Sequence, residues 1–90
     1  MPTPVHRQGA HRFEATVDGH AGRLDYEVHE GVLTIVHTEV DPALEGRGVA
    51  GALVRSALDH ARANGLKVRA RCAYAASYMD RHPESMSLRA

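Results

Sequence analysis

The residues most able to do chemistry gather in one segment, which reads Val40-Asp41-Pro42-Ala43-Leu44-Glu45-Gly46-Arg47-Gly48-Val49-Ala50. Here a strand-like pattern gives way to a helical one. The first turn of a helix presents N–H groups without intrahelical partners and a partial positive charge, which together bind anions. Gly46 and Gly48 let the backbone approach an anion because no Cβ stands in the way, and Arg47 adds a cation. The segment predicts a phosphate or pyrophosphate site. In the alternative interpretation, the glycines only permit a tight turn.

Two common nucleotide-binding motifs do not fit this segment. A P-loop is excluded because no Gly-Lys-Ser/Thr follows the glycines. A dinucleotide-binding fold is disfavoured because Gly46-x-Gly48-x-x-Gly51 does not open a βαβ unit at the start of the chain, and no acidic residue ends the following strand. The ligand therefore has to be inferred from the other residues of the loop.

Three further side chains are candidates for acid–base or nucleophilic chemistry. His37 and Glu39 stand at the polar end of the run 32–40 and share a face at a spacing of two. Either could be a general base: His has the better intrinsic pKa, and the pKa of a Glu would have to be raised by burial. Cys72 comes just before a predicted helix, a place that favours thiolate. The structural alternatives are a sheet histidine, a solvated acid and a buried inert thiol.

The chain holds seven His, which raises the question of a metal site. No two of them stand three or four residues apart, and only one Cys could join them. We therefore predict no metal site.

The elements that position these residues follow from hydrophobic periodicity. Apolar residues alternate over 12–17 and 23–29 and are continuous in the first half of 32–40, which predicts three antiparallel strands, the last one covered on both faces. A helical period from Val49 ends at Asn64-Gly65, a strand over 66–71 follows, and a second helix over 73–81 ends before Pro83. The helix between the third and fourth strands forms a crossover, so these two strands are expected to be parallel neighbours. The prediction is an α+β fold, with a mixed four-stranded sheet and two helices in the order β-β-β-α-β-α.

Length and composition allow one small domain. We assign residues 1–11 to a flexible N-terminal arm, 12–85 to a single domain and 86–90 to a frayed tail. Eleven basic and eleven acidic residues cancel, which argues against nucleic acid as the main partner. The lone Cys72 excludes an internal disulfide. No stretch approaches the roughly 18–20 apolar residues of a membrane span, and the first residues lack a signal-peptide core. The expectation is a cytoplasmic protein, with a homodimer compatible with the composition.

Two motifs resemble a known family. Val40-x-Pro42-x-x-Glu45-Gly46-x-Gly48-Val49-Ala50 is similar to the acetyl-CoA signature of the GNAT N-acetyltransferase superfamily, with Glu45 where Gln or Arg is usual. Thr38-Glu39-Val40, and Cys72 followed by His82-Pro83-Glu84, resemble a subgroup of very small GNAT-like proteins. Ordinary members of the family carry an Asn at the position of Cys72. Seven residues later, at the position of Met79, they carry a Tyr that acts as the acid for the departing thiolate. In this chain the nearest tyrosine, Tyr78, is one position away.

The resemblance implies transfer of an acetyl group from acetyl-CoA to an unidentified amine, on a small molecule or a protein. It assigns coenzyme A to Val40, Glu45, Gly46, Arg47, Gly48, Val49 and Ala50. It places the pantetheine arm between strands 32–40 and 66–71, which would separate beyond Glu39, with the Val40 N–H as oxyanion donor. Glu39, His37 and Cys72 are the catalytic candidates, Cys72 as a nucleophile or a cofactor contact. Arg81-His82 could reach the phosphates or cap the last helix. The alternative function is a non-catalytic coenzyme A-binding or protein-interaction module.

Overall fold

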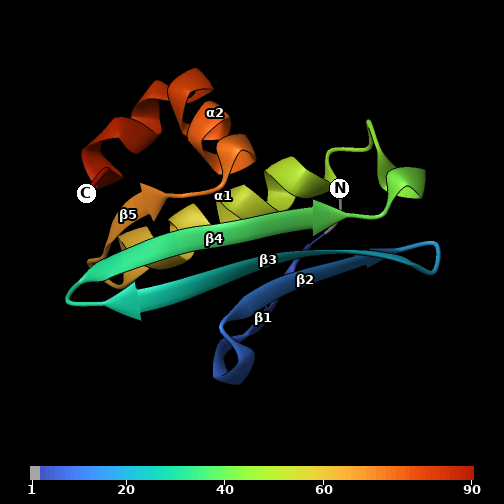
Figure 1. Cartoon of the computed structure of the whole chain (residues 1–90), viewed down its shortest axis with the longest axis horizontal. Coiled ribbons are helices and arrows are strands. Elements are labelled where there is room, and N and C mark those ends of the chain that lie inside the picture. The colour runs from blue at the N-terminus through green and yellow to red at the C-terminus, as the bar shows by residue number, and fades with distance from the viewer. Residues whose placement is uncertain (1–2) are drawn as a thin grey trace.

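A computed structural model describes residues 3–90 of the chain. Its sheet has five strands in sequential order: β1 (Val5–Arg7), β2 (Arg12–Val17), β3 (His20–His29), β4 (Val32–Val40) and β5 (Lys67–Ala70). All neighbours are antiparallel except β4 and β5, which are parallel (Figure 1). The α+β class, the antiparallel meander and the parallel crossover are confirmed. The predicted count of four strands is wrong, because β1 adds a strand at one edge.

The extra strand lies within the segment 1–11 that was predicted to be an arm. The only inward-facing residue of β1 is His6, whose ring stacks on Phe13 (4.2 Å between centroids) and whose Nε2 lies 2.5 Å from the hydroxyl of Tyr26. A 3₁₀ helix, Gln8–Ala10, then turns the chain into β2. A strand of three residues is too short to show an alternating pattern, and its one half-buried residue is a histidine. Residues 1 and 2 lie outside the described residues.

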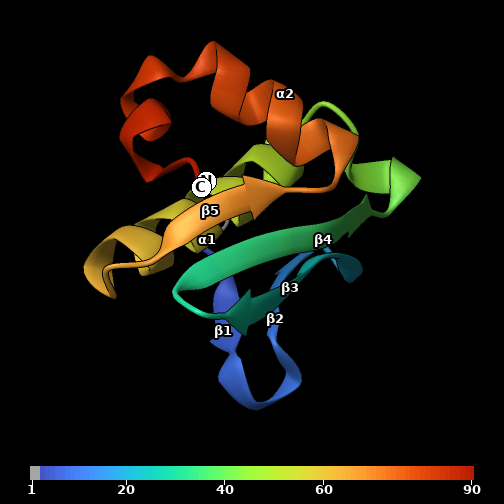
Figure 2. The ribbon, with the colours of Figure 1, turned by 60° about the vertical axis from the view of Figure 1, so that its left-hand side comes forward.

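Two α-helices complete the fold, α1 (Val49–Ala63) and α2 (Ala73–Arg81). α1 runs along one face of the sheet, here called the inner face, while α2 lies beside it towards the β5 edge (Figures 1 and 2). The core between sheet and helices is made by Phe13, Ala15, Leu24, Tyr26, Leu33, Ile35, Leu44, Val49, Leu53, Val54, Ala57, Leu58, Ala61, Val68, Ala75, Met79 and Leu88. None of the helices within residues 3–90 has both the length and the apolar character that crossing a membrane requires.

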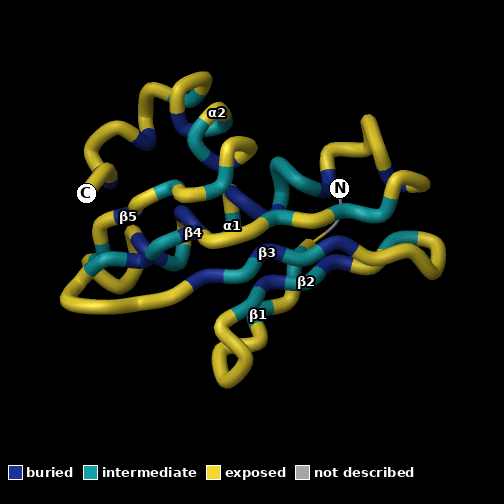
Figure 3. The backbone as a smooth tube through the Cα atoms, in the orientation of Figure 1, coloured by how far each residue is buried: buried dark blue, intermediate teal, exposed yellow. Residues whose placement is uncertain are grey.

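The opposite face of the sheet, here called the outer face, carries exposed or half-buried side chains: Arg12, Glu14, Thr16, Arg23, Asp25, His37 and Glu39. In Figure 3 buried and less buried positions alternate along β2 and β3, as expected for strands packed on one side only. The prediction that the apolar run of β4 is covered on both faces is wrong, since Val36 is 37% exposed. No helix of the described chain packs over this face of β4.

The tail after α2 is ordered by contacts with β5. The 3₁₀ helix Pro83–Leu88 buries Ser85, whose hydroxyl donates to the carbonyls of His82 (2.7 Å) and Met79 (3.2 Å). Leu88 is 8% exposed, and the N–H of Ala90 donates to the carbonyl of Val68 (2.9 Å). The prediction of a frayed tail over 86–90 is therefore wrong: this segment covers the open edge of β5, where backbone groups would otherwise lack partners.

β4 has two irregularities near the candidate site, a β-bulge on one side and an early end of its pairing with β5 on the other. The register between β3 and β4 shifts so that Asp25 and Tyr26 face His37 and Ile35, which leaves Val36 as the extra residue of a β-bulge. The pairing of β4 with β5 ends at Ile35 and Ala70, followed by one bond from the N–H of Arg71 to the carbonyl of Ile35. The two strands thus separate after Ile35, earlier than the predicted position beyond Glu39.

Candidate functional site

The loop between β4 and α1 is built around Asp41. Its carboxylate accepts a hydrogen bond from the N–H of Ala43 (2.9 Å) and contacts Nδ1 of His20 (3.0 Å), and these two contacts lower the pKa of Asp41. A short 3₁₀ helix, Pro42–Leu44, begins at this cap. Gly46 (φ 80°) and Gly48 (φ 79°) then turn the chain into α1. Only glycine adopts these angles without strain, so both are required by the turn itself.

The N-terminus of α1 is left open by this turn. Gly48 is its N-cap and has no side chain to satisfy the first N–H groups of the helix. A cavity of about 560 Å³, here called the inner pocket, lies against them. Six of the seven predicted cofactor residues line it: Val40, Glu45, Gly46, Gly48, Val49 and Ala50. The structure therefore brings together free helical N–H groups and a pocket, the arrangement that binds phosphate groups.

Arg47, the seventh predicted cofactor residue, does not line the inner pocket. Its guanidinium forms an ion pair with Asp18 (3.0 Å), which belongs to the turn between β2 and β3. Asp18 is 29 positions away in sequence, so no local pattern could have revealed the pair.

Tyr74 and Gly51 also line the inner pocket, and the sequence had not assigned them to it. A Cβ at Gly51 would lie 3.5 Å from the hydroxyl of Tyr74 and 3.6 Å from the ring of Tyr78, so this helical glycine gives the two α2 side chains room. A glycine inside the first turn of a helix has an entropic cost and no local role there. That cost is the signal that could have pointed to Gly51.

The backbone of Val40 points towards the gap between β4 and β5. The N–H of Asp41 donates to the carbonyl of Ala21 (3.0 Å), which makes the facing residues Val40 and Gly22 a non-hydrogen-bonded pair of the antiparallel ladder. In such a pair, the N–H groups point away from the partner strand. The N–H of Val40 therefore points away from β3, into the gap where β5 no longer pairs with β4. Gly22 allows this close packing, since a Cβ there would lie 3.1 Å from Val40 and Val49 side-chain atoms.

Cys72, the N-cap of α2, lies at the same gap beside Thr38, between the last β4–β5 pair at Ile35 and the position of Val40. Its sulfur is 3.5 Å from Oγ1 of Thr38. Burial opposes ionisation of this thiol, but the N–H groups of Ala75, Tyr74 and Thr38 and the Thr38 hydroxyl outweigh it, so the pKa of Cys72 lies below that of an ordinary thiol. Cys72 is half-buried and free, and it does not line the inner pocket.

His37 and Glu39 lie on the outer face, on the other side of the sheet from Cys72. The Glu39 carboxylate accepts from Nη1 of Arg23 (3.1 Å) and lies 3.4 Å from Nε2 of His37. The prediction that both share a face is correct. The three catalytic candidates nevertheless form no single cluster, because Thr38, the contact of Cys72, and Glu39 are neighbours whose side chains leave β4 on opposite faces.

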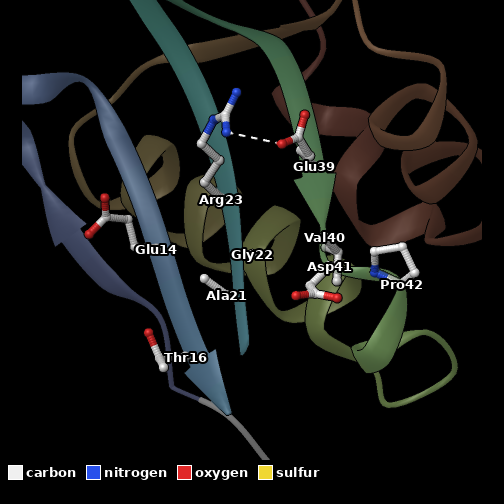
Figure 4. Close-up of a pocket in the computed structure, with 9 residues that line it drawn as sticks. All are labelled: Glu14, Thr16, Ala21, Gly22, Arg23, Glu39, Val40, Asp41 and Pro42. Carbon is white, nitrogen blue, oxygen red and sulfur yellow. Dashed lines mark hydrogen bonds and ion pairs between the residues drawn. The ribbon is translucent and has the colours of Figure 1, made fainter. Parts of the chain in front are cut away.

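A second cavity, of about 720 Å³, opens on the outer face and is here called the outer pocket (Figure 4). Its walls include Glu14, Thr16, Arg23 and Glu39. The segment Val40–Asp41–Pro42 lines both pockets. The end of β4 therefore forms a wall with one pocket on each side.

The remaining candidates lie away from both pockets. Tyr78 stacks on His82 (3.9 Å between centroids), and burial raises its pKa. Met79, at the position of the usual tyrosine acid, is 1% exposed and belongs to the core. Nδ1 of His82 lies 2.7 Å from the carbonyl of Tyr78, which fits the capping alternative. Within residues 3–90, no three His, Cys, Asp or Glu side chains are arranged to hold a metal ion.

Comparison with known proteins gives the chain a family. No curated protein matches it. The NMR structure of a GCN5-like candidate N-acetyltransferase from Staphylococcus aureus matches with a TM-score of 0.73 and 27% identity, over 93% of this chain and 85% of that one. The crystal structure of an acetyltransferase from Trypanosoma brucei shares the fold, with a TM-score of 0.50 and 22% identity over 71% of this chain and 54% of that one. The family described as GCN5-related N-acetyl-transferase matches residues 12–88, and the chain therefore belongs to the GCN5-related N-acetyltransferases.

Proposed function

We propose that the protein transfers the acetyl group of acetyl-CoA to a primary amine. The observation that carries the proposal is the inner pocket. The open N-terminus of α1 and Val40, whose N–H points into the gap between β4 and β5, both line it. The first offers donors for a pyrophosphate and the second offers a donor for a thioester oxygen. Family membership supports acetyl transfer in general.

The residues of the loop fit coenzyme A through their backbone. Gly46 and Gly48 have no atom within 4 Å of the position of a Cβ, so the space in front of them is open. Glu45 and Asp41 are the residues of the loop whose charges oppose a pyrophosphate. Glu45 is exposed, so water and salt screen its charge, and the Asp41 carboxylate is already in contact with the N–H of Ala43 and with His20. We assign the pyrophosphate to the N–H groups of residues 46–50. When bound, the cofactor supplies an acetyl thioester.

Val40 has the second role in this proposal. Negative charge that develops on the thioester oxygen during attack needs a fixed donor, and a preorganised N–H contributes more in a pocket than in water. The fold fixes this donor by strand register, so no side chain has to be ordered when the substrate binds.

We assign the general base to Glu39. It lines the outer pocket beside Val40, whereas His37 lines neither pocket and contacts Glu39 from the side. Glu39 takes one proton from the substrate ammonium, and the amine nitrogen attacks the acyl carbon. A C–N bond then forms, the C–S bond breaks, and the second amine proton passes to the departing thiolate. The products are the acetylated amine and the free thiol of coenzyme A.

Cys72 allows a second route to the same products. Its thiolate could take the acetyl group first, forming an Sγ–C bond as coenzyme A leaves with a proton, and pass it to the amine afterwards. The lowered pKa of Cys72 and its contact with Thr38, two residues before Val40 on β4, support this route.

A non-catalytic coenzyme A-binding module is the second candidate function. Met79 is buried where ordinary members of the family carry the tyrosine acid, and Cys72 and Glu39 lie on opposite faces of the sheet. A protein that binds coenzyme A without turnover would show both features.

Two measurements test the proposal. Coenzyme A at one hundred times its Kd should stabilise the protein by about 2.7 kcal/mol in thermal unfolding. No shift at millimolar coenzyme A would refute the assignment of the inner pocket. Mass spectrometry after incubation with acetyl-CoA and an amine library should then find acetylated amines, with less product from Glu39→Gln. Bound cofactor without any acetylated product would favour the module, and an acetyl adduct on Cys72 that disappears on adding amine would favour the second route.

A further inference from the structure

The outer pocket is larger than the inner pocket, about 720 Å³ against about 560 Å³, and is not lined by the glycines assigned to the pyrophosphate. It opens between the ends of β2, β3 and β4, where Ala21 stands next to Thr16 and leaves the space that longer side chains occupy elsewhere on this face. Figure 4 looks onto this face, with α1 behind the strands. A ligand can therefore reach the pocket from solvent without moving a helix.

The pocket is in contact with the proposed acyl site through one wall. Val40–Asp41–Pro42 lines both pockets, and Val40 is the residue whose N–H was assigned to the thioester oxygen. Glu39, the assigned base, directly precedes Val40 on β4, and its side chain lines the outer pocket. A molecule in the outer pocket thus lies next to the base, and only the segment Val40–Asp41–Pro42 separates it from the proposed acyl site.

Charged side chains around the pocket are held by a row of ion pairs that crosses four strands, here called the charge ladder. It runs Arg7–Glu14 (3.1 Å), Glu14–Arg12 (3.5 Å), Arg12–Asp25 (2.9 Å), Asp25–Arg23 (3.1 Å), Arg23–Glu39 (3.1 Å) and Glu39–His37 (3.4 Å). Among the three carboxylates of the ladder, side-chain exposure is 29% for Asp25, 37% for Glu14 and 59% for Glu39. Glu39 is therefore the carboxylate of the ladder that solvent and ligands reach most easily.

The lining of the outer pocket is acidic even though the whole chain is neutral. It contains the carboxylates of Glu14, Glu39 and Asp41 and one guanidinium, that of Arg23. Glu14 and Glu39 come from β2 and β4, two strand spacings or about 10 Å apart at the backbone. The negative groups therefore lie at two ends of the pocket.

From this arrangement we infer that the outer pocket binds the amine acceptor and that the acceptor is a small aliphatic diamine. The inference rests on the proposed function. One ammonium binds at the Glu14 end, while the other meets Glu39 beside Val40 and is the nitrogen that becomes acetylated. A monoamine fills only one of the two ends and binds more weakly.

The ladder explains how Glu39 can leave its partner for the substrate. When Glu39 turns to the ammonium, Arg23 keeps its bond to Asp25, and Asp25 keeps its bond to Arg12. No guanidinium is left without a carboxylate. Glu39 then accepts one proton from the ammonium and gives it to water after the acetyl group has moved from sulfur to nitrogen, so protons balance as in the proposed reaction.

The test is an NMR titration of the full chain with 1,4-diaminobutane and, as the matched probe, butylamine. The diamine should shift amides of Thr16, Ala21 and Glu39, and butylamine should bind several-fold more weakly. An exposed charge contact is worth about 0.2–1 kcal/mol, so Glu14→Gln should raise the Kd of the diamine by up to about fivefold. Thr16→Lys, which puts a cation into the hollow, should abolish binding. Glu27→Gln is the control, since Glu27 is exposed on the same face of β3 but outside the pocket.

A parallel titration with coenzyme A separates this inference from the proposed function. If coenzyme A binds and the diamine shifts no amide of the outer pocket, the diamine assignment is overturned and the proposed function stands. Equal affinities for diamine and monoamine, or equal effects of Glu14→Gln and Glu27→Gln, would also overturn it. Absence of coenzyme A binding would instead refute the proposed function.

Discussion

The two sides of the end of β4 offer ligands different kinds of groups. On the inner side the donors are backbone N–H groups, those of Val40 and of the first turn of α1, with one cysteine beside them. On the outer side the groups are long side chains, Glu14, Arg23 and Glu39, joined by exposed ion pairs. The inner side therefore offers backbone N–H groups, and the outer side offers side-chain charge.

This difference predicts how each side responds to substitution. Backbone donors are positioned by register and by turn geometry, so only changes that move the backbone should disturb the inner side. Exposed ion pairs contribute little individually and are screened by salt, so changes on the outer side should have small and graded effects.

The largest effect is expected for Gly48→Val. A branched side chain at a φ of 79° strains the backbone by about 1–3 kcal/mol, and relief of that strain would move the N–H groups of the loop. Coenzyme A affinity, measured by calorimetry, should fall by more than about tenfold, since 1.4 kcal/mol corresponds to one factor of ten. Gly65→Val is the matched control: Gly65 has a φ of 68° but lies at the far end of α1. Equal losses of affinity in both variants would mean that stability, and not the loop, limits binding.

A smaller effect is expected for Thr38→Val, which removes the hydroxyl beside Cys72. The thiolate loses one of the groups that offset its burial, so the pKa of Cys72 should rise. Alkylation by iodoacetamide, followed by mass spectrometry, should then be slower at neutral pH, and its midpoint should move to higher pH. Thr38→Ser keeps a hydroxyl and should react like the wild type. A Thr38→Val profile identical to the wild type would show that the N–H groups alone support the thiolate.

The long elements and the loop could be predicted from the sequence because each repeats its pattern several times. Alternation over 12–17 and the helical period from Val49 are examples, and the loop carries its chemistry in consecutive residues. The bulge at Val36 could not be predicted, because it exists only in the pairing with β3. The bulge reverses the alternation of β4. Odd-numbered residues before it, Leu33 and Ile35, face inward, whereas odd-numbered residues after it, His37 and Glu39, face outward.

Residues whose role depends on distant partners were also missed. β1 is held by His6, which packs against side chains of β2, β3 and α1 that no local window contains. The free cation expected at Arg47 is paired with Asp18 for the same reason. Single-residue contacts over long sequence separations leave no periodic signal.

The edge strand β1 gives a pH-dependent test of the fold away from both pockets. Burial, and then the neighbouring His60, lower the pKa of His6. The contribution of His6 is complete above about pH 6.5, the value for an unfolded chain, and is lost as the pH falls through the lower folded pKa. Urea unfolding between pH 8 and 5 should show a decline that His6→Phe reduces. Coenzyme A affinity should be less affected, because no residue of β1 lines the inner pocket. A decline of the same size in His6→Phe would assign it to other groups.

The smallest effect is expected at the pair between Arg47 of the β4–α1 loop and Asp18 of the β2–β3 turn. Asp18→Asn frees a guanidinium next to the inner pocket, and an exposed pair is worth about 0.2–1 kcal/mol. Coenzyme A should bind up to about fivefold more tightly, as measured by calorimetry at low salt, and the gain should vanish at high salt. Asp80→Asn breaks another exposed Asp–Arg pair, with Arg89 at the far end of the chain, and should leave affinity unchanged. Weaker binding in Asp18→Asn would instead mean that Asp18 holds Arg47 where the cofactor needs it, and the inner side would then depend on a side chain as the outer side does.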